Sequence, residues 1–188
     1  MGMELFVTIG IIIVIVFIIA WVIKTYNKLI DLKNKVKDQW SQVDVQLKRR
    51  FDLIPNLTET VKGYARHEEE TLTAVINARN DAINAKTPKA EIEANGVLTG
   101  ALKKLFALAE SYPDLKANEN FIDLQNNLRE TENKISFARQ FYNDTVLMYQ
   151  NAIEMFPSNM IATMFGFKSK EFYKMENDDD RINPVMDF

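Results

Sequence analysis

LFVTIGIIIVIVFIIAWVI, from Leu5 to Ile23, is the stretch that decides the fold of this 188-residue chain. None of its nineteen residues is charged, and fifteen of them are Leu, Ile, Val or Phe. An α-helix of this length spans about 28 Å, close to the roughly 30 Å hydrocarbon core of a bilayer. Unpaired backbone groups are costly in lipid, so a segment that crosses the bilayer alone has to be helical. The sequence therefore predicts a transmembrane anchor, which we place at residues 1–24.

A cleaved signal peptide is the alternative for this segment. Such a peptide needs a basic start, a shorter apolar run and small residues at its cleavage site. Met1–Glu4 carries no Lys or Arg, and Ala20 is followed by Trp21. We therefore expect the segment to be retained.

The residues at the end of the span predict its orientation. Lys24 and Lys28 follow the span and no Lys or Arg precedes it. The positive-inside rule then places the short N-terminus outside and the rest of the chain in the cytoplasm, with a periplasmic location as the less favoured alternative. Trp21 lies where aromatic side chains gather at a membrane interface.

Charge is spread unevenly over a chain whose net charge is −3. Residues 24–50 hold eight basic and three acidic side chains, whereas the rest of the chain from Phe51 holds fifteen basic and twenty-two acidic ones. A basic collar next to the bilayer suits anionic lipid headgroups, at up to about 1 kcal/mol for each well-placed Lys. The same pattern is also what an ordinary cytoplasmic flank of a span shows. An acidic body does not suit nucleic acid, which we exclude as a partner.

Apolar residues recur at helical spacing through the rest of the chain. They predict one long helix through residues 29–64, kinked at Pro55, because the phase of the pattern survives the proline. A second helix opens at Glu68–Glu70, and a third starts at Thr87-Pro88 and ends near Tyr112-Pro113. A fourth runs from Phe121 to Phe156 and a short one covers residues 159–165.

The predicted fold is therefore all-α. We expect a transmembrane helix that continues into an antiparallel four-helix bundle with long helices. The bundle domain is placed at residues 25–176, and residues 177–188 form an acidic, solvated tail.

Little in the sequence points to catalysis. The chain has no Cys and one His, His67, and a metalloprotease helix would need a second His where Thr71 stands. Asp178–Asp180 lacks the alternating spacing and the glycine of a calcium loop. We predict no catalytic, cofactor-binding or metal-binding residues, no cofactor, and a protein that is not an enzyme.

Four segments are not explained by apolar periodicity. They are RRFDLIPNL at 49–57 with VKGYARHE at 61–68, SYPDLKANE at 111–119, TEN at 131–133 with AR at 138–139 and FYND at 141–144, and FPSN at 156–159 with GF at 166–167. In this order after an N-terminal span, they closely resemble the LemA family of bacterial membrane proteins. The resemblance covers residues 26–176 and leaves the acidic tail outside.

The resemblance implies a helical bundle on a single-pass anchor in the bacterial inner membrane. No catalytic residue can be carried over from the resemblance. The family itself is linked only loosely to membrane organisation and to membrane proteases. The motif residues that patterning leaves unexplained are Arg49, Arg50, Asp52, Pro55, Asn56, Gly63, Tyr64, Glu132, Asn133, Arg139, Tyr142, Asn143, Pro157, Gly166 and Phe167.

A structural role is the favoured interpretation of the polar motif residues, and a ligand site is the alternative. Asp52 is three positions from Arg49 and four from Asn56, so these side chains can pair along one helix face. We expect Arg50 or Arg49 to reach Glu132 across the bundle. A broken buried ion pair of this kind costs roughly 3 kcal/mol or more.

The segment at residues 160–167 is apolar nearly all round. Either it packs against the end of the bundle, or it is a contact surface for another subunit or the bilayer. The candidate contact residues are Met160, Ile161, Met164, Phe165 and Phe167.

The leading functional hypothesis is a non-enzymatic, membrane-anchored scaffold that self-associates or organises membrane proteins or the local bilayer. The alternatives are an adaptor or sensor for a membrane protease or an envelope-stress signalling system, and a lipid-binding protein. The expected partners are membrane lipids, further copies of this chain, and a membrane protease or other membrane protein.

Overall fold

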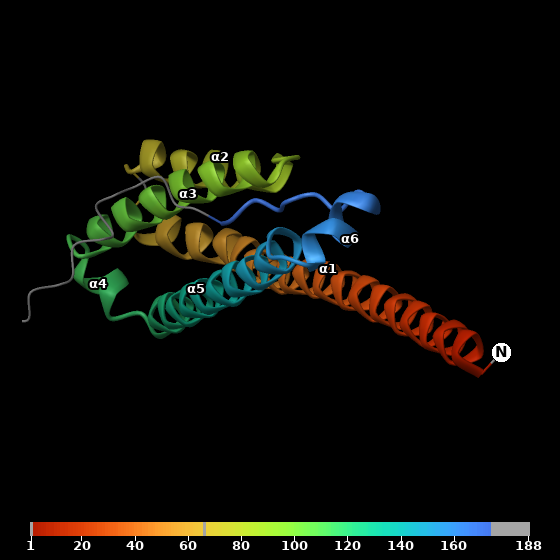
Figure 1. Ribbon diagram of the computed structural model, residues 1–188. Helices are drawn as coiled ribbons and strands as arrows, with labels where there is room; N and C mark the ends of the chain where they lie inside the picture. Colours follow the sequence, from red (N-terminus) through yellow and green to blue (C-terminus); the bar gives the residue numbers. More distant parts are fainter. Residues whose placement is uncertain (1, 66, 174–188) are drawn as a thin grey trace, which may run out of the picture. The chain divides into compact units, whose positions relative to one another are not determined.

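The computed structural model describes residues 2–65 and 67–173. In this part of the chain there are six helices and no strand, so the predicted all-α fold is confirmed (Figure 1). The helices are α1 (Gly2–Tyr64), α2 (Glu69–Asn84), α3 (Pro88–Ala109), α4 (Pro113–Lys116), α5 (Glu119–Glu154) and α6 (Ser158–Met164). The antiparallel four-helix arrangement and the bounds of the anchor and bundle domains stay predictions. The acidic tail at 177–188 lies outside the described residues.

Helix α1 is continuous through Pro55, as the uninterrupted apolar phase predicted. Its N-terminal part is long and apolar enough to cross a membrane, and none of that window is buried in the described structure. The Thr58 hydroxyl donates a 3.0 Å hydrogen bond to the carbonyl oxygen of Pro55. The helix ends at Tyr64, where the helix predicted through residues 29–64 also ends.

The other predicted helix ends lie close to those observed. Thr87 caps α3 by accepting a hydrogen bond from the backbone N–H of Ala90, with Pro88 in the first turn. Helix α4, which follows Pro113, was not predicted. Helix α5 ends at Glu154, so Phe156, expected as the last apolar member of that helix, lies outside it and is exposed. The reason is Pro157, because a residue before proline disfavours the helical conformation.

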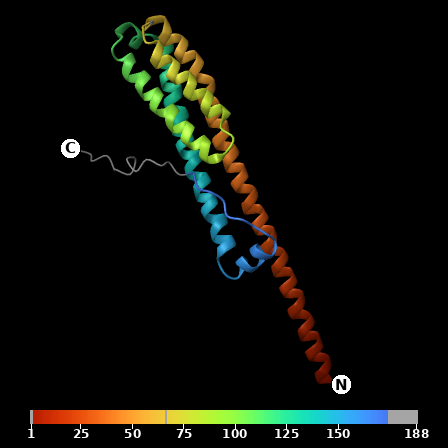
Figure 2. The same cartoon turned by 90° about the horizontal axis from the view of Figure 1, so that it is seen from above.

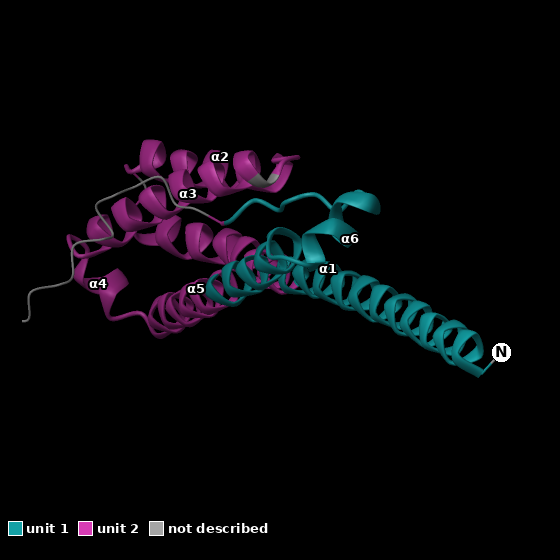
Figure 3. Ribbon diagram, viewed as in Figure 1, with its two compact units in different colours: residues 1–41, 140–172 teal, residues 42–139, 173–188 magenta. Residues whose placement is uncertain are grey.

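Two compact units make up the chain (Figure 3). Unit 1 contains residues 1–41 and 140–172, and unit 2 contains residues 42–139 and 173–188. Helices α1 and α5 each contribute one part to either unit.

Unit 2 holds the larger apolar core. Helices α2 and α3 pack against each other, side by side in Figure 2. The buried core residues come from α1 to α5 and from Ala65, directly after α1: Ile54, Leu57, Val61, Ala65, Leu72, Val75, Ala78, Ala82, Leu98, Leu102, Leu105, Ala109, Leu115, Phe121 and Leu128. Large apolar side chains buried from five helices are what fixes this unit, since burying each contributes roughly 1.5–3 kcal/mol.

Unit 1 has a smaller core where α6 meets α1. Leu29 is buried with Ile161 and Ala162, and Tyr26 and Phe167 pack against them. Further along α1, the Trp40 ring meets the Tyr142 ring edge-on at 5.1 Å. The segment after α6 is held on α5 by hydrogen bonds to its backbone.

Candidate functional site

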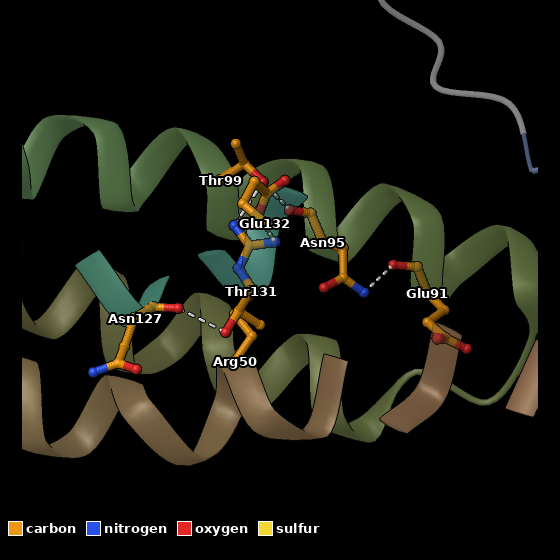
Figure 4. A network of polar contacts seen from close by, with 7 residues as sticks. All are labelled: Arg50, Glu91, Asn95, Thr99, Asn127, Thr131 and Glu132. Carbon is orange, nitrogen blue, oxygen red and sulfur yellow. Dashed lines mark hydrogen bonds and ion pairs between the residues drawn. The ribbon is translucent and has the colours of Figure 1, made fainter. Parts of the chain in front are cut away.

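Arg50 is the centre of a buried polar network in unit 2 (Figure 4). Only 2% of this residue is exposed, although it carries a charge that α1 places among apolar neighbours. Its Nη1 lies 3.2 Å from Glu132 Oε2 on α5, and its Nη2 donates a 2.8 Å hydrogen bond to Thr99 Oγ1 on α3. The ion pair expected from Arg50 or Arg49 is thus formed by Arg50, which ties three helices together.

The network continues along α3. Thr99 Oγ1 donates to the carbonyl oxygen of Asn95 at 2.9 Å, and Asn95 Nδ2 donates to that of Glu91 at 2.8 Å. On α5, the buried Thr131 donates to the Asn127 carbonyl oxygen at 2.7 Å, which satisfies a hydroxyl inside the apolar face. These bonds explain how polar side chains are accommodated in the interior of the unit.

Glu91 is the titratable group that this environment changes most. The pKa of its carboxyl is raised to about 7: burial is the largest cause, the negative charge of Asp44 acts in the same direction, and Arg139 opposes both. Burial also raises the pKa of Asp44. Burial lowers the pKa of the Arg50 guanidinium while Glu132 opposes that change, so the ion pair keeps Arg50 charged.

Arg139 and Tyr173 extend the same region. The Arg139 guanidinium lies 4.5 Å from the centre of the Tyr173 ring, within range of a cation–π contact. Tyr173 is buried, and burial raises the pKa of its hydroxyl. Sequence reasoning selected Arg139 but missed Tyr173.

The helix-face pairs proposed for the first motif are not formed. Arg49, Asp52 and Asn56 are exposed, and no hydrogen bond or ion pair joins Asp52 to the other two in the described structure. Correct spacing permits such a pair, but solvated side chains gain too little from it to hold one geometry. Pro55 and Asn133 are exposed as well. Asn56 lines a shallow depression together with Thr60, Asn120, Asp123, Leu124 and Asn127.

The first two motifs meet in unit 2. Asn118 Nδ2 donates a 2.9 Å hydrogen bond to the Tyr64 hydroxyl, and its Oδ1 accepts one from the Phe121 N–H at 3.0 Å. Asn118 therefore caps α5 while it contacts the end of α1. The Tyr112 hydroxyl donates to Glu68 Oε1 at 3.0 Å, and Leu115 of α4 is fully buried. Gly63 is exposed, and a Cβ there would meet no atom within 4 Å.

The fourth motif ends α6. Gly166 has a φ of 69°, in the left-handed region. Phe167 N–H donates to the Ala162 carbonyl oxygen and Gly166 N–H to that of Thr163, at 2.9 and 3.2 Å. This is the Schellman pattern, which favours glycine at that position. Pro157 precedes α6 and is exposed.

Tyr142 lies in unit 1 and is buried, and its hydroxyl donates a 2.8 Å hydrogen bond to the Glu171 carbonyl oxygen. The Tyr149 hydroxyl donates to the Lys168 carbonyl oxygen at 2.9 Å, and Gln150 Nε2 to that of Lys170 at 3.4 Å. Asn143 beside Tyr142 is half-buried and also engaged. The third motif therefore divides between the two units, with Glu132 and Arg139 in one and Tyr142 and Asn143 in the other.

The apolar segment at 160–167 has some side chains that pack on this chain and others that are exposed. Ile161 and Phe167 face α1, where Phe167 lies 5.9 Å from the Tyr26 ring and Lys33 Nζ lies 6.0 Å from the Phe167 ring. Met160, Met164 and Phe165 are exposed, although the Phe165 ring touches Tyr26 at 4.7 Å. One face of the segment thus packs on this chain, and the other faces outward.

Several residues of the network were missed from the sequence: Asp44, Glu91, Asn95, Thr99 and Tyr173. One signal could have found three of them. Glu91, Asn95 and Thr99 are spaced by four and form a polar stripe beside the buried Leu98 and Leu102. As for metals, the described residues contain no group of three or more His, Cys, Asp or Glu side chains placed to hold an ion.

This chain belongs to the LemA family, whose model matches residues 39–188. The match includes the acidic segment at 177–188, which corrects the expectation that this tail lies outside the family's pattern. A charge run carries no apolar periodicity, so patterning could not assign it.

Curated relatives include two kinds of protein. The chain is 23% identical over 186 residues to magnetosome protein MamQ 1 of Paramagnetospirillum magneticum, covering 85% of this chain and 68% of the relative. It is 22% identical over 185 residues to MamQ of Magnetospirillum gryphiswaldense, with the same coverage. It is 26% identical over 140 residues to protein LemA of Metamycoplasma hominis, covering 72% of this chain and 63% of that protein. Together with the apolar part of α1, these findings support a membrane-associated helical protein.

Proposed function

We propose that this protein is a non-enzymatic membrane-anchored scaffold whose copies associate through the outer face of α5. The observation that carries the proposal is a set of exposed apolar side chains in unit 1. Phe141 and Met148 on α5, and Met155 directly after its last residue, stand seven positions apart, and each is more than half exposed. Seven-residue spacing is that of one of the two apolar positions in the heptad by which helices pack along a common seam.

The interior of the protein favours a structural role over a ligand site. Arg50, the most polar group in unit 2's interior, is buried and already bound by Glu132 and Thr99. Such a network fixes which helices meet, because any other pairing would leave a buried charge without its partner. The names of the magnetosome relatives tie those proteins to a larger cellular structure, as is expected for a scaffold.

The test is the mass of the full-length protein in mild detergent, beside two variants. Phe141→Glu combined with Met148→Glu places charges in the seam and should reduce the assembly to monomers. Leu147→Glu is the matched control, because Leu147 is also exposed on α5 but points about 100° away from Met148. A monomeric unmodified protein would overturn the proposal and favour the adaptor for a membrane protease or stress signalling system.

We further propose that the protein lies in the bacterial inner membrane with its N-terminus outside. Lys24 and Lys28 are exposed just after the span, as the positive-inside rule requires of a cytoplasmic flank. The chain has no Cys, so single cysteines at Met3 and at Lys170 report the side directly. In right-side-out vesicles, an impermeant maleimide should label the position 3 variant alone. Labelling of the position 170 variant alone would reverse the orientation.

A further inference from the structure

Helix α6 is fixed at the level where α1 leaves the bilayer. Ile161 and Ala162 are buried against Leu29, and Trp21 and Val22 pack around the same cluster. Trp21 and Val22 belong to the apolar span itself, and Leu29 lies about 9 Å beyond Ile23 along the helix. Figure 2 shows α6 beside this part of α1. A helix attached at this level lies within the headgroup region rather than in bulk water.

The side of α6 that does not touch α1 is also apolar. Met160 is 60% exposed, Met164 is 72% exposed, and Phe156 in the preceding turn is 79% exposed. Phe165, directly after α6, is 51% exposed, and one part of its ring also contacts Tyr26 of α1. These four side chains form what we call the α6 patch. A cluster of large apolar groups on an exposed surface marks an interaction site with a protein or a membrane.

The charges around the α6 patch fit a lipid surface. Lys24 and Lys28 on α1, and Lys168 and Lys170 after α6, are all exposed. The acidic side chains nearest to α6 in the sequence are Glu154, the last residue of α5, and Glu171, so the balance over these six residues is positive. Basic side chains next to an apolar helix face are typical of segments that lie in the membrane interface.

We propose that the α6 patch enters the bilayer that α1 spans, as a second membrane contact of unit 1. The α6 patch adjoins the lipid-facing surface of the span, because both belong to the same unit and α6 packs on Trp21. The position of α6 therefore favours contact of the α6 patch with the bilayer over contact with a second copy of the chain. The proposal rests on the membrane anchor and is independent of self-association through α5.

The experiment uses the full-length chain in vesicles of mixed neutral and anionic lipid. The chain has no Cys, so a polarity-sensitive fluorophore can be attached at Met160→Cys or Met164→Cys, with Leu147→Cys on α5 as the matched control. All three side chains are half exposed or more. Spin-labelled lipids should quench the two α6 probes several-fold more than the control, and aqueous iodide should quench the control several-fold more than the α6 probes.

Either of two results would overturn the proposal. Iodide quenching of the α6 probes equal to that of the control would place the α6 patch in water. Protection from both quenchers, lost when the protein is diluted with lipid, would show that a second copy covers it. The mass measurement on the α5 variants is separate, so failure of one proposal leaves the other testable.

Discussion

Arg79 Nε on α2 donates a 2.7 Å hydrogen bond to the carbonyl oxygen of Phe51 on α1. Phe51 is the residue whose carbonyl would accept from position 55 in a regular helix, and Pro55 has no N–H to give. The arginine thus replaces the donor that proline removed and joins α2 to α1 at that point. The proline alone implies that this carbonyl loses its helical donor, but the sequence does not identify the new partner, because α2 meets α1 only in the folded unit.

Replacing Arg79 with Met should therefore lower the free energy of unfolding by about 2 kcal/mol, the usual effect of losing a hydrogen bond from a charged donor. The same change in a Pro55→Ala protein should lower it much less, because an alanine at that position would supply the missing N–H. Urea unfolding in mild detergent, followed by circular dichroism, measures both. Arg129→Met is the control, since Arg129 is exposed. Equal losses with and without Pro55 would show that the hydrogen bond is not a substitute for the helical one.

Removing Glu132 should destabilise the protein by leaving Arg50 with only the Thr99 hydroxyl. The Glu132 side chain is 40% exposed, so water replaces part of the lost interaction. The expected loss for Glu132→Ala is therefore about 2 kcal/mol, below the roughly 3 kcal/mol of a fully buried broken pair. Glu130→Ala is the comparison, because Glu130 pairs with Lys134 on the exposed surface and its removal should leave the melting temperature almost unchanged. Similar melting temperatures for the two variants would contradict this interpretation of the network.

Glu91 should make stability depend on pH. Its pKa is raised from 4.5 to about 7 on folding, so the folded state holds a proton that the unfolded state releases. The contribution of the Glu91 carboxyl to the free energy of unfolding is fully present below about pH 4.5, and it is lost as the pH rises through 7. Partial solvent screening reduces the effect to about 1–2 kcal/mol. Glu91→Gln should remove this loss, so that the variant is more stable than the unmodified protein at about pH 8 and nearly equal to it at about pH 4.5. A pH-independent difference would exclude Glu91 as the source.

The two motif glycines should respond oppositely to alanine. Gly166→Ala forces a side chain into the left-handed region and should cost about 1 kcal/mol. Gly63→Ala meets no atom and lies in a helix, where alanine is favoured by up to about 1 kcal/mol. Thermal melting of the two variants under one detergent condition compares them. A stabilised Gly166→Ala protein would contradict the cap assigned to Gly166.

The helices were predictable where local signals are strong, and the polar network was not. The spacing of apolar residues predicted that α1 continues across Pro55, and Thr87-Pro88 predicted where α3 starts. Both features depend on residues that are neighbours in the sequence. The ion pair of Glu132 was predicted with Arg50 or Arg49, because Glu132 interrupts the apolar face of its helix, and the structure forms it with Arg50. The spacing of Thr99 marks it as part of a polar stripe, but its contact with Arg50 depends on which helix faces meet. Tyr173 follows the last helix, so no helical pattern could place it. Helix α4 was missed because four residues are too few to show a period.

The hydroxyls of Tyr142 and Tyr149 hold residues 168–171 by hydrogen bonds to the carbonyl oxygens of Glu171 and Lys168. Every amino acid has the same backbone carbonyl group. These hydrogen bonds therefore do not depend on which side chains residues 168–171 carry. Substitutions at Lys168 or Lys170 leave the attachment intact, whereas loss of a tyrosine hydroxyl does not. The charge of this segment can therefore change without loss of these two hydrogen bonds, whereas each of them requires its tyrosine hydroxyl.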